Sequence, residues 1–346
     1  MTVRRVVAVL AVALSCVACS TRGVSPPEAP APILRVAVLQ YSDVADPVEL
    51  VSSSALAVDL AIERAEARGE LGAGSGLWFV ETAGDDPVAI ERAARALAAD
   101  PAVAAAIVTP YVDAPAAERA FGEAGIPVFS FSGFGGDPGA TTWRRLVPSA
   151  SDEAAAVDAL VGQEPCVAGR SPVPFPTEGI HLGSDPAAVT RATEERCSGI
   201  AWTGDADGGL DAVRALESAG SSVPFVVGST ARVDRFASEG YPGAVGTLAV
   251  VPCRTVSVSA EPDARRFVHG YQARNGVPPG LCAAEGYGLG LWLIERPSRA
   301  AIAAAVEAGV SISTPAGTID LSAGEEVEPA VERVVGVRWI PVLEAP

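Results

Sequence analysis

The chain contains no lysine and only two histidines, and aromatic residues make up only 5% of its 346 residues. Acidic residues outnumber basic ones, which gives a formal net charge of −17. Because binding to nucleic acid needs a basic surface, this charge excludes a nucleic-acid partner, and it also excludes attachment to anionic lipid by charge. What the sequence does have is an apolar fraction of 49%, enough for a substantial core. The length predicts two domains or one unit with two lobes.

The start of the chain has the pattern of an export signal. Arg4 and Arg5 precede an apolar run, Val6–Val17, which is shorter than the roughly 20 residues of a membrane-spanning helix. The run ends in small residues before Cys19, a pattern that resembles the bacterial lipobox. It predicts a signal peptide over residues 1–18 and a lipid on the Cys19 thiol. Two alternatives stay open: cleavage before Cys16, and an ordinary signal peptide in which the cysteine is incidental.

Four cysteines remain in the rest of the chain: Cys166, Cys197, Cys253 and Cys282. An even number in an exported protein predicts two disulfides. Of the three connectivities, chain order favours Cys166–Cys197 and Cys253–Cys282. The alternative is a metal site, which the lack of any CxxC pair and the shortage of histidine (His181 and His269) disfavour. The sequence therefore predicts neither a metal nor a cofactor.

Short apolar strands alternate with helices from Leu34 onward, after a proline-rich segment, residues 19–33, that predicts an extended tether. Strands are expected at Arg35–Leu39, Leu77–Val80, Val103–Val108 and Ile126–Ser130, and helices at Ser54–Arg68, Pro87–Ala98 and Pro115–Ala124. Such alternation with short connections predicts a parallel sheet covered by helices on both faces. Ligands of such sheets bind beyond the carboxyl ends of the strands.

A second alternating series begins near Val147. Strands are expected at Gly179–Leu182, Gly199–Trp202, Phe225–Val227, Val245–Val251, Gly317–Leu321 and Val334–Ile340, and helices at Asp152–Gly162, Pro186–Arg196, Gly208–Ala219, Asp263–Asn275, Ala283–Glu295 and Arg299–Ala308. The two series predict an α/β fold of two lobes, and the late segments must return to complete both.

The order of these segments resembles the type I periplasmic solute-binding proteins, above all the branched-chain amino-acid receptors of ABC transporters. The segments that carry the resemblance are Val36–Leu39, Leu77–Glu81, Asp85–Pro87, Ala106–Pro110, Gly125–Ser132, Arg145–Ser149, Phe267–Gly276 and Ala284–Gly288. This resemblance implies two doubly wound parallel-sheet lobes joined by a hinge of three crossings, near Pro148, Thr255 and Val327. The N-terminal lobe would comprise residues 34–147 plus 256–326, and the C-terminal lobe residues 148–255 plus 327–346.

The function that the resemblance implies is that of an exported receptor on the outer face of the cell membrane, held there by its N-terminal lipid. It would bind a small polar ligand, an amino acid or a related carboxylate or amide, between its lobes. Hinge closure would enclose the ligand for delivery to the permease of an ABC importer. This function involves no covalent chemistry.

The resemblance also implies candidate ligand contacts. In the first lobe, hydroxyls and backbone N–H groups at strand ends would hold a carboxylate, and the candidates are Tyr41, Ser42, Thr109, Tyr111, Ser130, Ser132 and Phe134. Phe134 stands where the family has a small hydroxyl residue. In the second lobe the candidates are Trp202, Asp205 and Ser229, and Asp205 would replace the acidic residue that the family has near Ser229. The alternative is that these residues have structural roles: the serines would form turns, Trp202 would pack in the core, and Asp205 would lie in a solvated loop.

Two other classes of function are alternatives to this receptor. An enzyme is disfavoured because the chain has no GxSxG motif, and Gly133-Phe134-Gly135-Gly136 is followed by Pro138 instead of a helix start. The alternative that stays open is a cell-envelope lipoprotein that uses the same fold as a sensor or protein-interaction module. The missing carboxylate near Ser229 and the short segment Gly169–Glu178 favour it, whereas the hydroxyl-rich loops of the first lobe favour a solute.

Overall fold

The computed structural model describes residues 30–41, 53–82, 87–110, 115–133, 142–169, 179–192, 195–256, 261–309, 311–320 and 327–342. The chain from Pro32 to Pro346 forms one compact unit. The signal peptide, Cys16 and the predicted lipidation site Cys19 lie outside the described residues. Among the helices that are described, none combines the length and the apolar character needed to cross a membrane.

The first sheet contains five parallel strands in the order β2-β1-β3-β4-β5. They are β1 (Arg35–Tyr41), β2 (Gly76–Thr82), β3 (Val103–Val108), β4 (Val128–Ser130) and β5 (Trp143–Arg145). Every residue of β3 is buried, as expected for a central parallel strand with both faces covered. The short apolar runs of the sequence therefore predicted the strands of this sheet, except for β5.

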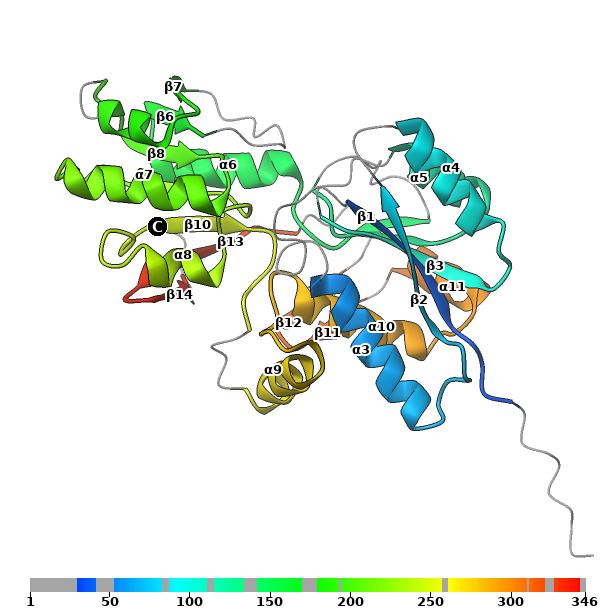
Figure 1. Ribbon diagram of the computed structural model, residues 1–346. Coiled ribbons are helices and arrows are strands. Elements are labelled where there is room, and N and C mark those ends of the chain that lie inside the picture. The colour runs from blue at the N-terminus through cyan, green and yellow to red at the C-terminus, as the bar shows by residue number, and fades with distance from the viewer. Residues whose placement is uncertain are drawn as a thin grey trace, which may run out of the picture. The chain divides into compact units, whose positions relative to one another are not determined.

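Helices cover both faces of the first sheet (Figure 1). They are α3 (Ser53–Ala67), α4 (Pro87–Ala98) and α5 (Pro115–Glu123), followed late in the chain by α10 (Ala283–Ile294) and α11 (Arg299–Ala308). Helix α9 (Pro262–Asn275) packs against α3. Alternate residues of β1 enter different cores: Ala37 and Leu39 pack with α4 and α5, whereas Val36 and Val38 join the core that contains α3 and α10. Helices α3 and α10, far apart in the sequence, thus lie side by side on one face.

The second sheet contains seven strands in the order β14-β13-β10-β9-β8-β6-β7. They are β6 (Pro165–Ala168), β7 (Ile180–Gly183), β8 (Gly199–Trp202), β9 (Phe225–Val227), β10 (Leu248–Val251), β13 (Ala330–Val335) and β14 (Arg338–Pro341). Strands β6 to β10 are parallel, and β13 and β14 add an antiparallel ribbon beside β10. The helical elements that belong to this part are α6 (Ala150–Val161), η1 (Pro186–Ala192), α7 (Ala206–Ser218) and α8 (Asp234–Glu239).

Two local predictions were wrong. The single late strand expected at Val334–Ile340 is the hairpin β13–β14, which turns at Gly336 with a left-handed φ of 63°. The helix expected at Pro186–Arg196 is the short 3₁₀ helix η1. The strand expected at Gly317–Leu321 is confirmed as β12 (Gly317–Asp320), which pairs with β11 (Ser311–Thr314) in a separate two-stranded sheet.

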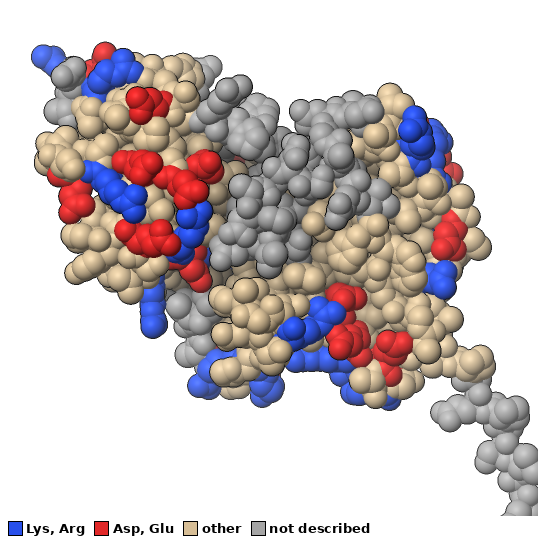
Figure 2. All heavy atoms as spheres, in the orientation of Figure 1, with Lys and Arg blue, Asp and Glu red and all other residues tan. Residues whose placement is uncertain are grey.

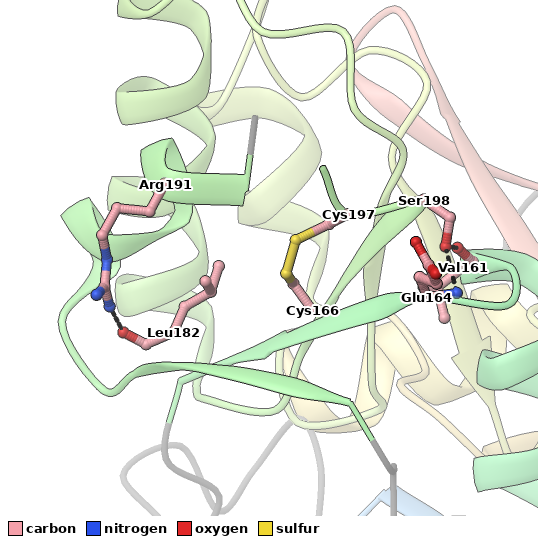
Figure 3. The surroundings of a disulfide bond; sticks show 7 residues. All are labelled: Val161, Glu164, Cys166, Leu182, Arg191, Cys197 and Ser198. Atoms are coloured by element: carbon pink, nitrogen blue, oxygen red, sulfur yellow. Dashed lines mark hydrogen bonds between the residues drawn. A yellow bond between two sulfur atoms is a disulfide. The ribbon is translucent and has the colours of Figure 1, made fainter. Parts of the chain in front are cut away.

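Both disulfides have the connectivity that chain order favoured, Cys166–Cys197 and Cys253–Cys282. Figure 3 shows the first, which joins β6 to the residues just before β8. Beside it, the Ser198 hydroxyl donates to the Val161 carbonyl at 2.6 Å and accepts from the Glu164 N–H at 3.1 Å. The second disulfide joins the residues after β10 to the start of α10.

Arginine and acidic side chains are interspersed over the face drawn in Figure 2. Described ion pairs include Arg274 with Asp59 and Glu63, and Arg235 with Asp207. Exposed pairs of this kind contribute only about 0–1 kcal/mol each. The described part of this face therefore offers charge of both signs and no broad basic patch.

Candidate ligand-binding site

The predicted first-lobe residues Thr109, Ser130 and Ser132 lie together at the carboxyl edge of the first sheet. Val108 pairs with Ser130 in the register of β3 and β4, so Thr109 and Ser132 follow neighbouring strand ends. All three side chains are fully buried. The Thr109 hydroxyl donates to the Leu39 carbonyl at 3.0 Å, and the Ser130 Oγ accepts the Ser132 N–H at 3.1 Å. These hydroxyls stabilise the edge itself.

The same edge is joined to the first connection between the sheets. The Gly133 carbonyl accepts the N–H of Ala150 at 3.0 Å, at the start of α6. Ser149 caps α6, because its side chain accepts the Asp152 N–H while the Asp152 carboxylate accepts the Ser149 N–H. A Cβ at Gly133 would lie 3.1 Å from the Pro148 carbonyl and from the Ala150 nitrogen. Glycine therefore lets the edge approach the connection closely.

The predicted second-lobe residues lie together at the carboxyl edge of the second sheet. Trp202 ends β8 and is 3% exposed, and its indole N–H donates to the Asp205 carbonyl at 2.9 Å. The exposed Asp205 caps α7 by accepting the Gly208 N–H at 2.8 Å. Ser229 is buried after β9, where the Thr230 hydroxyl donates to the Gly204 carbonyl at 2.9 Å. Trp202 and Asp205 thus both have structural contacts at this edge.

The side chains of the other predicted contacts are not among those that the structure describes. Tyr41 ends β1, but its side chain is not among those described. Ser42, Tyr111 and Phe134 lie outside the described residues.

A cavity that the sequence analysis missed lies where the three connections between the sheets meet. Its volume is about 380 Å³, within the range of roughly 300–1,000 Å³ typical of small-molecule sites. Leu146 belongs to the first connection, Cys253 and Arg254 to the second, and Val327 and Glu328 to the third. Helix α10 and the β11–β12 hairpin complete the described lining.

Glu285, in the first turn of α10, lines this cavity and is only 6% exposed. Its Oε2 is buried and has no hydrogen-bond partner among the described residues. Burial raises the pKa of this carboxyl to about 7, although a backbone hydrogen bond and the positive charge of Arg254 act in the opposite direction. The sequence held a signal for this residue, because Glu285 is the one charged residue in the otherwise apolar or small-residue segment Ala283–Ile294.

The charges that line the cavity are mainly negative. Its described lining includes the carboxyl groups of Glu285, Asp320 and Glu328 and a single guanidinium, that of Arg254. Glu285 is buried, whereas the other three residues are exposed. Within the described residues, no group of three or more histidine, cysteine or acidic side chains is placed to hold a metal ion. The arrangement suits an organic ligand that donates hydrogen bonds.

Comparisons with solved structures identify the fold. A protein from Rhodopirellula baltica described as a possible leucine/isoleucine/valine-binding protein matches with a TM-score of 0.68 at 14% identity, covering 92% of this chain and 98% of that one. A fatty acid ABC transporter substrate-binding protein from Thermomonospora curvata gives 0.67 at 12% identity, covering 90% and 91%. A branched-chain amino acid substrate-binding protein from Streptococcus pneumoniae, in complex with isoleucine, gives 0.66 at 14% identity, covering 90% and 100%.

The fold is that of the type I periplasmic binding proteins. This confirms the fold class that the sequence predicted. No protein-family model matches the sequence, and a search of curated proteins finds no match. At identities of 12–14% the likeness of these structures concerns the fold, so the function has to be argued from the residues of this chain.

Proposed function

We propose that the protein is an extracytoplasmic solute receptor, anchored by a lipid on Cys19, that binds a small polar ligand and delivers it to an ABC importer. The observation that carries the proposal is the cavity at the meeting point of the three connections. If the part of the chain built on the first sheet rotated against the part built on the second, the backbone angles in these connections would change. Binding of a ligand there would therefore be coupled to hinge closure. Binding and release require no covalent step, so the protein acts as a receptor and not as an enzyme.

The similar structures do not identify the ligand, because these proteins are described with ligands that differ from one another. One is described with isoleucine and another as a fatty acid receptor. The fatty acid protein is described as an ABC transporter substrate-binding protein and the isoleucine-bound protein as a transporter substrate-binding protein, and these descriptions support the proposal. The ligand class must follow from the residues that line this chain's own cavity.

A thermal-shift screen of the compact unit Pro32–Pro346 tests solute binding. The panel contains amino acids, amides, small carboxylates, amines and fatty acids. A ligand at a hundredfold excess over its Kd stabilises the folded state by about 2.7 kcal/mol, so a true solute raises the melting temperature clearly. A shift confined to one chemical class supports the receptor, and the absence of a shift throughout the panel contradicts it.

The lipid anchor has a separate test. In cells that express the full chain, we expect radiolabelled palmitate to be incorporated into the wild type and not into Cys19→Ala. The variant Cys16→Ala is the matched control, and it should be labelled like the wild type. Loss of label in Cys16→Ala alone would indicate that cleavage occurs before Cys16 and that Cys16 carries the lipid. Absence of label from the wild type would contradict the anchor.

A second candidate function is a sensor or interaction module of the cell envelope. The observation that favours it is that the Thr109 and Ser130 hydroxyls already bond to the chain, and that Trp202 is buried at the other edge. The thermal-shift screen separates the two functions, because only the solute receptor predicts stabilisation by a small molecule.

A further inference from the structure

We propose that the cavity among the three connections binds a small organic amine, with the Glu285 carboxylate as the group that recognises the ammonium. This inference rests on the proposed function and names the ligand class of that receptor. It differs from the expectation that Asp205 holds an ammonium, since Asp205 caps α7. Three observations support it.

The first observation is the unsatisfied oxygen of Glu285. A buried carboxylate oxygen without a partner is unfavourable, because the group loses its hydration and gains no hydrogen bond in return. Among the described residues, Oε2 of Glu285 has no such partner, and Glu285 lines a cavity large enough for a small molecule. An ammonium group donates charge-assisted hydrogen bonds, which are about twice as strong as those between neutral groups. Binding of an amine would therefore satisfy this oxygen.

The second observation is the charge of the lining. Besides Glu285, the cavity has the carboxyl groups of Asp320 and Glu328 and the guanidinium of Arg254. An amino acid would bring a carboxylate into surroundings with more negative than positive groups, whereas an amine brings only positive charge. The lining therefore favours an amine over an amino acid or a dicarboxylate.

The third observation is the rigid position of Glu285. Helix α10 packs against α3, and a Cβ at the neighbouring Gly286 would overlap the Ser54 carbonyl oxygen. The disulfide Cys253–Cys282 ties the start of α10 to the second connection. A recognition group held by its helix loses little conformational freedom when it binds, which favours affinity.

The test uses three probes of equal chain length: putrescine, 1,4-butanediol and succinate. We expect putrescine to raise the melting temperature of the compact unit Pro32–Pro346, and the diol and the dicarboxylate to leave it unchanged. Calorimetric titration should show that Glu285→Gln weakens putrescine binding at least tenfold. Glu153→Gln is the matched control, because Glu153 is also buried, its pKa is raised to about 8, and it is not among the described lining residues. This control should bind putrescine like the wild type.

The pH dependence of binding separates recognition from a purely structural role. As burial raises the pKa of Glu285 to about 7, ionised Glu285 becomes dominant between pH 6 and pH 8. Putrescine affinity should then increase up to about tenfold over this range in the wild type and stay flat in Glu285→Gln. The charged residues that line the cavity together with Glu285 are Arg254, Asp320 and Glu328.

Several outcomes would overturn the inference. Equal putrescine binding by the wild type and Glu285→Gln would show that this carboxylate does not recognise the amine. Stabilisation by succinate, amides or amino acids without any effect of putrescine would contradict the amine class and leave the solute receptor standing. No stabilisation by any compound of either panel would contradict both proposals.

Discussion

Arg232 and Glu332 form an ion pair at 2.6 Å, and their side chains are only 6% and 1% exposed. Both residues contact Thr255 in the second connection: Arg232 donates to its hydroxyl at 2.9 Å, and Glu332 accepts its N–H at 3.2 Å. Trp339 lies beneath the guanidinium, with its ring centre 5.7 Å away. The pair therefore fixes one end of a connection that lines the cavity.

Loss of the arginine should destabilise the protein strongly. In Arg232→Met the Glu332 carboxylate is left buried without its counter-charge, which costs about 3–5 kcal/mol. Urea denaturation measures this loss. The double variant Arg232→Met/Glu332→Leu should be more stable than the single one, because it no longer contains the buried, unpaired Glu332 carboxylate. Arg214→Ala, which removes an exposed pair with Asp211, is the control and should change stability by less than about 0.5 kcal/mol. Equal effects of Arg232→Met and Arg214→Ala would contradict this account.

The two disulfides should contribute similarly to stability and differently to binding. Their cysteines are 31 and 29 residues apart in the sequence, and loops of this length predict a stabilisation of about 3–4 kcal/mol for each. Replacing Cys253 and Cys282 by alanine should also weaken solute binding, since Cys253 lines the cavity. Replacing Cys166 and Cys197 should leave affinity unchanged. Denaturation and calorimetry of both double variants check this, and an equal loss of affinity in both would exclude a specific role for Cys253.

The ionisation of Glu285 predicts a pH-dependent stability. Its folded pKa, about 7, lies above the ordinary value of 4.5, so the folded state retains the proton between these values when the unfolded state has lost it. This group therefore lowers the free energy of unfolding as the pH rises from about 4.5 to 7. Glu285→Gln should match the wild type at pH 4 and be more stable at pH 8. Parallel stability curves for the two proteins would show that Glu285 ionises normally.

Close packing of α3 against α10 should make Gly286 intolerant of a side chain. A Cβ there would overlap the Ser54 carbonyl oxygen, and overpacking of this kind costs about 1–3 kcal/mol or more. Gly122, in α5, is the control because the nearest atom to its Cβ would be 3.8 Å away. Thermal denaturation should show Gly286→Ala to be destabilised and Gly122→Ala to be unchanged or slightly stabilised. A tolerated Gly286→Ala would mean that the helices are less tightly packed.

Much of the fold could be predicted because its signals are local. Val103–Val108 is apolar at every position and became a strand buried on both faces, and chain order gave both disulfides. The hairpin β13–β14 was missed because Gly336 lies inside an apolar run and its turn depends on a left-handed φ that the apolar pattern does not reveal. Local pattern therefore predicts a strand and misses a reversal within it.

The candidate site could be predicted only in part. The strand ends near Thr109 and Ser130 do lie together, because parallel strands bring their carboxyl ends to one edge. The cavity was missed because its lining combines Leu146, Cys253, Glu285 and Glu328, which lie far apart in the sequence. The sequence places Glu285 in a helix, but no periodicity indicates that this residue lines a cavity.

Calorimetric titration of the compact unit Pro32–Pro346 with the most stabilising compound of the thermal-shift screens tests the central claim most directly. The account predicts saturable binding of one molecule per chain, weakened when the cavity residue Glu285 is replaced by glutamine. No saturable heat with a compound of any class in the screens would contradict a solute receptor.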